Sequence, residues 1–384
     1  MASAPVTVFA CGDVMTGRGI DQILPHSGNP GLREPQAGDA RDYVRLAERV
    51  SGPIPAPADF GWPWGDALAV VDSMAPAVRL INLETSVTSS DAFAPGKRVH
   101  YRMSPANLPC VAAIRPDACA LANNHVLDFG PPGLAETLAV LTGAGLRIAG
   151  AGRDLAEARR PAAIPLPGGG RVLVFSRGSR SSGIPRDWAA APARPGVCLL
   201  PAPPATTGAG SAASTGRATG GAGELAAQLR EAKRDGDLAV VSIHWGPNWG
   251  YEVSPDEVGL AHALIDAGAD LIHGHSSHHP RPVEVYRGKL ILYGCGDCVN
   301  DYEGIAGHRE FRGDLRLLYF ASLAPGTGDL ESLTMVAMRS RKMRLEHASP
   351  ADARWLAGTL TEASLPFTAG ARCLPDGTLR LHWK

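Results

Sequence analysis

The sequence lacks the long apolar runs, paired cysteines and charge excess that mark several large classes of protein. No segment reaches the roughly 18 apolar residues needed to span a bilayer, although 45% of the 384 residues are hydrophobic. The formal net charge is −1, so there is no broad basic field and we do not expect nucleic acid as a partner. The seven cysteines show no disulfide-framework spacing, which indicates a reducing compartment.

The first ten residues do not resemble a secretory leader. They lack a basic start, and Pro5 and Thr7 interrupt their apolar stretch. We therefore expect a cytoplasmic protein, at most peripherally attached to a membrane, with no signal peptide or transmembrane segment.

Several common catalytic signatures are also missing. The sequence has no Walker A loop and no G-x-S-x-G nucleophile elbow, and the glycines at 143–150 miss the dinucleotide-binding spacing. Cys295 and Cys298 have C-x-x-C spacing, but a zinc ribbon needs a second pair and the sequence contains none. We interpret these two cysteines as small buried residues in a turn that follows a strand.

Short apolar strands alternate with helical segments over most of the chain, and hairpin signals come late, at Arg287-Gly288 and Asp376-Gly377. This order predicts the α/β class with mixed sheets. Helix starts are expected at Ser104, as an N-cap before Pro105, and at Ser254. We predict one domain over residues 1–340, with a flexible low-complexity insertion at about 201–223. A C-terminal helix and hairpin at 341–384 would pack on that domain.

Residues 270–280 hold four of the twelve histidines, His273, His275, His278 and His279, directly after a short apolar strand. One interpretation is a polar surface turn that happens to be rich in histidine. The other is an active-site loop, because imidazole is the commonest metal ligand and a proton shuttle near neutral pH. The second interpretation requires other strands to end in matching groups.

Other predicted strands do end in polar groups, and the carboxyl ends of sheet strands share one edge where ligands bind in α/β folds. The groups are Asp13, Asn82 and Glu84, Asn123-Asn124-His125, and His244. This mixture of oxygen and nitrogen donors suits Mn, Fe or Zn. Such an ion would generate hydroxide near neutral pH and polarise an oxyanion.

Five motifs resemble, in order, the signature blocks of the CapA family of capsule and poly-γ-glutamate synthesis proteins, and the histidine loop resembles its actinobacterial branch of polyglutamine synthesis accessory proteins. The motifs are Gly12-Asp13-Val14-Met15, Asn82-Leu83-Glu84, Ala122-Asn123-Asn124-His125, His244-Trp245-Gly246 and His273-Gly274-His275. The CapA family is similar to calcineurin-like metallophosphoesterases. This implies an αββα sandwich with two mixed sheets.

The resemblance also implies roles for single residues. A divalent metal (Mn, Fe or Zn) would be held by Asp13, Glu84, Asn124, His244 and His275. Catalysis would involve Asp13, with His125 as the general acid and His278 at a later ligand position. Substrate contacts are expected from Arg18, Asn82, Asn123, Trp245 and Asp297. Other basic and aromatic side chains near the motifs could also contact substrate. For Lys97, Arg98, Arg102 and Arg281 the competing interpretation is solvated surface charge, and for Trp249 and Tyr251 it is core packing.

Three departures from the metallophosphoesterase pattern bear on the metal. Met15 stands where the first motif has a histidine, Glu84 replaces an aspartate, and two residues separate His275 from His278 instead of one. Losing an imidazole ligand favours one ion over two, or none.

Three functions follow from this reasoning. The first two place the protein in the biosynthesis, transport or localisation of a glutamate or glutamine polymer, and in the third the protein modifies a peptide. The first is a metal-dependent hydrolase acting on the polymer or on a phosphorylated intermediate of its assembly. The second is a non-catalytic accessory factor that binds the anionic polymer, with a membrane-bound polymer synthase as a partner. The third is a metal-independent peptide epimerase in which Asp13 and a facing histidine exchange an α-proton.

Overall fold

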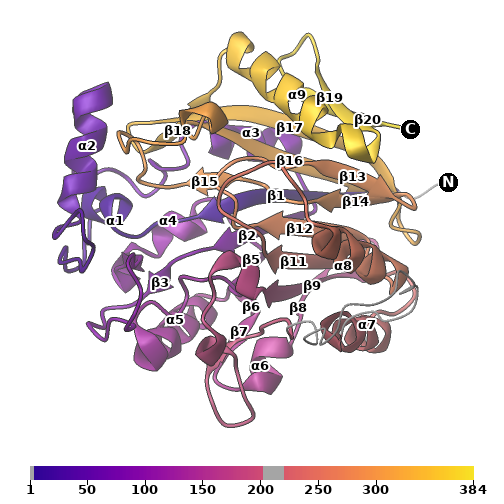
Figure 1. Cartoon of the computed structure of the whole chain (residues 1–384), viewed down its shortest axis with the longest axis horizontal. Helices are drawn as coiled ribbons and strands as arrows, with labels where there is room; N and C mark the ends of the chain where they lie inside the picture. Colours follow the sequence, from indigo (N-terminus) through magenta and orange to yellow (C-terminus); the bar gives the residue numbers. More distant parts are fainter. Residues whose placement is uncertain (1–3, 202–219) are drawn as a thin grey trace, which may run out of the picture.

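The computed structural model describes residues 4–201 and 220–384, which form two packed β-sheets with helices on the outer faces (Figure 1). The larger sheet is mixed and has the order β19-β20-β17-β16-β1-β2-β5-β6, with β15 on β1 and β18 on β17. Its strands are β1 (Val6–Val14), β2 (Val78–Leu83), β5 (Ala118–Ala120), β6 (Arg147–Ala149), β15 (Asp297–Val299), β16 (Leu315–Leu323), β17 (Leu330–Arg341), β18 (Arg344–His347), β19 (Ala369–Cys373) and β20 (Leu379–Trp383).

The second sheet has the order β13-β14-β12-β11-β9-β8, and the four strands β9, β11, β12 and β14 run parallel. Its strands are β8 (Ala162–Pro165), β9 (Arg171–Gly178), β11 (Leu238–His244), β12 (Leu271–His275), β13 (Val283–Tyr286) and β14 (Lys289–Leu292). Two further strand pairs are short: β3 (Ser86–Val87) with β4 (Arg102–Met103), and β7 (Ala151–Gly152) with β10 (Gly196–Val197).

The helices cover the outer faces of the two sheets. On the larger sheet they are α3 (Ala67–Met74) and α5 (Gly130–Gly143), whose apolar residues share one core cluster with β1 and β2. Residues of α2 (Arg41–Ser51) belong to the same cluster, but this helix packs mainly on α1 at the end of the molecule (Figure 1). On the second sheet they are α7 (Gly220–Ala232) and α8 (Pro255–Asp266). The others are α1 (Gly19–Ile23), α4 (Pro109–Ala112), α6 (Leu155–Arg159) and α9 (Pro350–Ser364), with 3-10 turns η1 (Pro105–Asn107), η2 (Arg180–Ser182), η3 (Arg186–Trp188), η4 (Arg309–Phe311) and η5 (Leu365–Phe367).

A separate core cluster fills the space between the sheets, and strand alternation sets which residues enter it. On β11, Leu238 and Val240 lie in this inner cluster, whereas Ala239 and Val241 pack outward beneath the helices. Because side chains alternate with a period of two, the next inward positions on β11 are Ser242 and His244. The strand therefore changes from apolar to polar on its inner face as it reaches its carboxyl end.

The predicted α/β class and αββα sandwich are confirmed. The capping box at Ser254 and Glu257 is present at the start of α8. The helix predicted to start at Ser104 is wrong in form, since a 3-10 turn and the four-residue α4 follow and the Ser104 side chain caps neither. Most of the predicted insertion, residues 202–219, lies outside the described residues, and α7 already begins at Gly220.

The C-terminal segment continues the larger sheet. β20 pairs with β17 and β19 pairs with β20, while α9 packs against β19. Residues 341–384 therefore lengthen the same sheet that β17 belongs to. Among the helices of the described residues, none combines the length and apolar character needed to cross a bilayer.

Candidate functional site

Strand register brings the predicted polar strand ends together at one edge of the sandwich. In the larger sheet, Asp13 on β1 lies beside Asn82 on β2 and Asp297 on β15. In the second sheet, His244 on β11 lies beside His275 on β12. The two sheets face each other across this edge.

The tightest group in the site is the trio Asp13, His244 and His275. Their possible ligand atoms lie within 4.8 Å of one another, and all three side chains are buried. The Nδ1 atoms of His244 and His275 are 2.8 Å apart, and His275 Nδ1 lies 3.8 Å from Asp13 Oδ1. Within residues 4–201 and 220–384, no other three His, Cys, Asp or Glu side chains meet this spacing.

The other predicted ligands, Asn124 and Glu84, lie next to His244. His244 Nε2 lies 3.2 Å from Asn124 Oδ1 and 3.7 Å from Glu84 Oε1. His125 Nε2 lies 3.9 Å from the same Glu84 oxygen. The structure therefore brings the five proposed ligands and His125 into one continuous chain of donor atoms.

Asp13 is held on both of its oxygens. The Asn82 amide donates to Oδ1 (2.6 Å) and the Ser276 N–H donates to Oδ2 (3.1 Å). Ser276 makes this bond from a backbone φ of 101°, a value that residues with side chains rarely adopt. Burial, and then the nearby Asp297 carboxylate, raise the pKa of Asp13 to about 7.

Gly12 explains how β15 can approach Asp13 so closely. A Cβ on Gly12 would lie 1.6 Å from the carbonyl oxygen of Gly296. The Asp13 N–H donates to that same oxygen at 2.9 Å. The glycine in the first motif is therefore required by a backbone contact and not by a turn.

The electrostatics of the trio fit a bound cation. Burial and the neighbouring Asp13 raise the pKa of Glu84 well above its usual value. Burial and neighbouring imidazoles lower the pKa values of His244 and His275, so both rings are neutral and can offer a free nitrogen. Neutral imidazoles beside buried carboxylates are the donor set that Zn, Mn or Fe takes, and a cation would offset the mutual repulsion of these carboxylates.

His125 is oriented by two residues that sequence reasoning did not assign to it. The His125 Nδ1 atom lies 2.6 Å from Asp128 Oδ2, and Lys97 bonds the other Asp128 oxygen at 2.5 Å. Burial and Lys97 lower the pKa of His125 well below its usual value. The spacing His125-x-x-Asp128 was the available signal for the pair, whereas the contact with Lys97 depends on a loop path that has no sequence signature.

His278 lies on the other side of Asp13 and not within the trio. Its Nδ1 lies 2.9 Å from Asp297 Oδ1, and its Nε2 lies 3.1 Å from the Asn248 amide nitrogen. Burial opposes protonation of His278, but the Asp297 carboxylate raises its pKa above the usual value. Asn300 donates to the second Asp297 oxygen at 2.7 Å. His278 and Asp297 thus form a buried ion pair next to the trio.

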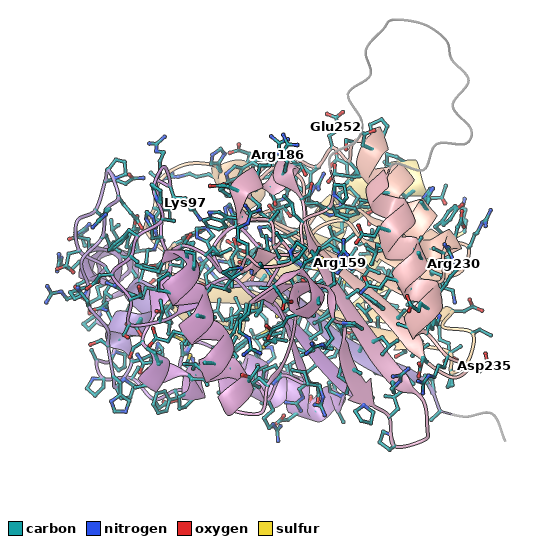
Figure 2. The ribbon with its side chains drawn as sticks, turned by 90° about the horizontal axis from the view of Figure 1, so that it is seen from below. Lys97, Arg159, Arg186, Arg230, Asp235 and Glu252 are labelled. Carbon is teal, nitrogen blue, oxygen red and sulfur yellow. The ribbon has the colours of Figure 1, made fainter. Side chains whose placement is uncertain are left out.

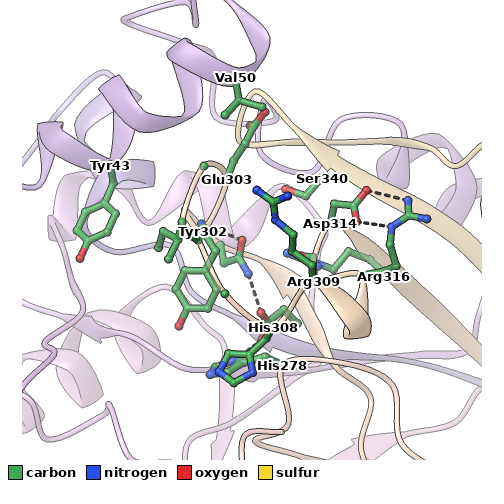
Figure 3. Close-up of a pocket in the computed structure, with 18 of the residues that line it drawn as sticks. Tyr43, Val50, His278, Tyr302, Glu303, His308, Arg309, Asp314, Arg316 and Ser340 are labelled. Atoms are coloured by element: carbon green, nitrogen blue, oxygen red, sulfur yellow. Dashed lines mark hydrogen bonds and ion pairs between the residues drawn. The ribbon is translucent and has the colours of Figure 1, made fainter.

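A cavity of about 790 Å³ opens beside this pair (Figure 3). His278 and Asp297 lie in its wall, with Tyr302 and Glu303 from the following loop. Trp249 also lines it, and its ring stacks on His308 with centroids 4.1 Å apart. The polar strand ends therefore connect to a space that could hold a ligand.

Several predicted substrate contacts have other roles. Trp245 is 1% exposed, packs on Tyr293 in the core and donates to its carbonyl, so the substrate contact predicted for it is wrong. The alternation of side chains along β11 explains this, because the residue next to the inward-facing His244 must point toward the outer face of the sheet. The amides of Asn82 and Asn123 are buried and bonded within the site, so they position its other members.

The predicted basic contacts are mostly buried ion pairs. Arg18 lines the cavity, but it bonds both Glu34 and Asp301 and lies between aromatic rings. Arg281 is fully buried against Glu257, so neither substrate binding nor solvated charge describes it.

Two loop histidines and the cysteines are structural. His273 bonds the Cys11 carbonyl across the sandwich (2.8 Å), and His279 accepts from the Gly250 N–H. Cys295 and Cys298 are buried free thiols around the turn, as predicted.

Comparisons with known proteins give a matching family model and several similar proteins. The family model described as bacterial capsule synthesis protein PGA_cap matches residues 7–302. A probable polyglutamine synthesis accessory protein of Mycobacterium tuberculosis is 52% identical over 99% of this chain and 97% of its own length. The PGA biosynthesis protein CapA of Bacillus subtilis is 29% identical over 57% of this chain and 52% of its length. Among solved structures, a phosphatase from Mycoplasma pneumoniae aligns with a TM-score of 0.46 and 11% identity, over 88% of this chain and 95% of that one.

Proposed function

Because the chain belongs to the family of bacterial capsule synthesis proteins, we propose that it acts in the synthesis of a glutamate or glutamine polymer of the cell envelope, and that its strand-end site is a metal-dependent hydrolytic centre. The observation that carries the second part is the buried trio Asp13, His244 and His275, with donor atoms within 4.8 Å. The polymer or a phosphorylated intermediate of its assembly would be the substrate. A membrane-bound polymer synthase would be the partner.

The trio would hold one Mn, Fe or Zn ion, with Asn124 and Glu84 beside it. When bound, such an ion supplies a hydroxide near neutral pH and stabilises a developing oxyanion. Met15 supports one ion rather than two. Its sulfur lies 3.5 Å from the Tyr302 hydroxyl in a buried position, where a second ion would need an imidazole.

His125 is the residue we propose for proton transfer: its ring is neutral, so its free Nε2 would first accept a proton from the nucleophilic water and then pass it to the leaving group. Its Nε2 faces Glu84 and the trio, while its Nδ1 is engaged by Asp128. This hydrogen bond sets the ring orientation and the tautomer. Lys97 holds Asp128 in place, so both are positioning residues for His125.

His278 would contact the substrate on the cavity side of the site. Its pairing with Asp297 keeps a positive charge next to the cavity, where it can attract an anionic group. The trio would then lie at the inner end of the bound substrate and the cavity would hold the rest.

Elemental analysis of the purified full-length protein tests this proposal. We expect about one equivalent of Mn, Fe or Zn in the wild type, and its loss in His275→Ala and in Asp13→Asn. His308→Ala serves as the matched control, because this exposed imidazole lies at the cavity and outside the trio. Release of phosphate from a generic phosphoester should follow the metal content of the variants.

A metal-free wild type, prepared without chelator, would refute the hydrolytic centre. The accessory and epimerase functions would then remain, and deuterium uptake at Cα of a peptide substrate would separate them. Uptake without hydrolysis supports an epimerase, whereas polymer binding without either reaction supports an accessory factor.

A further inference from the structure

The cavity beside the strand-end site contains two arginines that form no direct ion pair within the described residues. Arg309 lies in η4 and Arg316 on β16, and both line the cavity. Among the described residues, neither has a carboxylate oxygen within 4.0 Å of its guanidinium. Figure 3 shows Arg309 extending into the space between Glu303 and Ser340.

The other cavity arginines are neutralised within the protein. Arg312 pairs with Asp314 and Asp352, and Arg339 pairs with Asp314. Arg18 is held by two carboxylates, as described above. Arg341 pairs with Glu346 at 4.0 Å and His278 pairs with Asp297, so the cavity cations that form no ion pair within the described residues are Arg309 and Arg316. Of the carboxylates that line the cavity, Glu303 forms no ion pair in the described part of the chain and bonds Ser51 and the Met343 N–H instead.

Arg316 is the more informative of the two free arginines because it is only 1% exposed. Its Nε donates to the Cys298 carbonyl, and its Nη1 donates to the carbonyls of Gly313 and Leu315. In the described part of the chain its Nη2 has no hydrogen-bond partner. A buried guanidinium that lacks a counter-ion is costly, and an anion in the cavity would relieve this cost.

The position of Arg316 connects the cavity with the strand-end site. Burial alone would raise the pKa of Asp297, but the charges of His278 and then Arg316, with a bond from Asn300, hold it below its usual value. The field of Arg316 thus reaches the residue that pairs with His278. An anion bound at Arg316 would lie next to the group proposed to contact substrate.

The mouth of the cavity is apolar on one side. Val50 of α2 and Ile305 of the loop after β15 line it and are 64% and 47% exposed. The Trp249 ring forms another part of the wall. A cavity of about 790 Å³ is within the range of about 300–1,000 Å³ that holds a drug-sized ligand, so it has room for more than a single small ion. The buried Arg316, the exposed Arg309 and these apolar groups suit a chain that carries both carboxylates and methylene groups.

We propose that Arg316 and Arg309 form an anion subsite that binds a free carboxylate of a glutamate chain, and so place that chain against His278 and the metal trio. The subsite rests on the proposed function for the identity of the chain. Guanidinium groups bind carboxylates through paired, charge-assisted hydrogen bonds. The same groups also bind phosphate, so the experiment needs an arm for each anion.

Isothermal titration calorimetry on the full-length protein tests the subsite, with a glutamate hexamer, a glutamine hexamer and inorganic phosphate as the probes. Wild-type protein should bind the glutamate hexamer at least about tenfold more tightly than the glutamine hexamer, because only the former can offer carboxylates. Arg316→Gln should weaken binding of the glutamate hexamer by roughly tenfold or more, and Arg309→Gln by roughly threefold to tenfold.

Two variants keep the result interpretable. Arg230→Gln is the matched control, because Arg230 is exposed on α7, on the opposite side of the molecule from Lys97 (Figure 2). We expect it to bind like the wild type. If Arg316→Gln fails to fold, Arg309→Gln and Arg316→Lys carry the test, since Lys retains the charge but loses the paired geometry.

Equal binding of the two hexamers, or glutamate binding unchanged in both arginine variants, would overturn the proposal. Arg316-dependent binding of phosphate without binding of the glutamate hexamer would also overturn it. Metal content, measured in the same preparations, separates this result from the proposed function. Arginine-dependent glutamate binding by a metal-free protein supports the subsite and refutes the metal centre, and a metal-loaded protein that ignores the glutamate hexamer does the reverse.

Discussion

Glu257→Gln should destabilise the histidine loop through a buried ion pair that anchors its C-terminal end. Arg281 follows the loop, and its guanidinium is fully buried against Glu257 at 2.7 Å. The Arg281 N–H also bonds the Gly294 carbonyl, which ties the loop to the segment after β14. Removing the carboxylate charge leaves a buried guanidinium without a counter-ion.

The expected loss is about 3 kcal/mol in the free energy of unfolding. Breaking a buried ion pair typically costs about 3–5 kcal/mol, and the lower end applies because glutamine keeps one oxygen that can accept from Arg281. For a chain of 384 residues a loss of this size corresponds to a fall in Tm of roughly 4 °C. The variant should also show faster hydrogen exchange in residues 276–282.

The pH dependence provides a second, independent check. Burial alone would raise the pKa of Glu257, but the bonds from Arg281 and then Ser254 hold it below its usual value. A carboxyl with a lowered folded-state pKa stabilises the fold above its unfolded pKa, about 4.3, and loses this contribution as the pH falls through the folded value. The free energy of unfolding of the wild type should therefore exceed that of the variant most near neutral pH. The two values should converge below about pH 4.

Urea unfolding followed by tryptophan fluorescence measures the free energy of unfolding and its pH dependence, because Trp245 lies in the core and reports on unfolding. Asp266→Asn is the matched control on the same helix, since Asp266 pairs with Arg287 at the surface and such pairs contribute about 1 kcal/mol or less. A Glu257→Gln loss below about 1 kcal/mol, or a difference that persists in acid, would show that the pair does not anchor the loop.

Three further predictions concern the site. Asp128→Asn should lower any hydrolytic rate by about 10²-fold or more with unchanged metal content, because His125 loses its orienting carboxylate; a loss of metal would show that Asp128 acts on the metal site instead. Gly12→Ala should destabilise the fold by more than about 3 kcal/mol, measured by urea unfolding, because its Cβ would overlap the Gly296 carbonyl, and wild-type stability would contradict this packing. Met15→His should raise the metal content from one toward two equivalents by elemental analysis; an unchanged content would mean that Met15 is not what limits the site to one ion.

The inner ends of the strands were the most predictable part of the site. Apolar runs that stop at Asp13, Asn82, His244 and His275 are visible in the sequence, and parallel strands must end at the same edge. The same alternation that turns His244 inward turns Trp245 into the core. The core position of Trp245 follows from the alternation of side chains along the strand, whereas its aromatic character had suggested a substrate contact.

The pairing of charges over long sequence distances was the least predictable part. Arg18 and Arg316 are both arginines near polar motifs, yet Arg18 meets Asp301 and Arg316 meets only carbonyl groups. Lys97 reaches Asp128 from a loop without secondary structure. Such contacts depend on the paths of loops, which no local pattern encodes.

The sequence by itself determined the α/β class, the edge at which the site forms and most of its chemical groups, because these follow from local apolar runs, strand periodicity and the polar residues that end each strand. Only the tertiary structure decided which of those groups meet. Sheet register placed Asp13, His244 and His275 together, moved His278 to an ion pair with Asp297 and left Arg316 buried at a cavity. The physical reason is that donor distances and charge balance depend on the packing of two sheets formed by segments hundreds of residues apart.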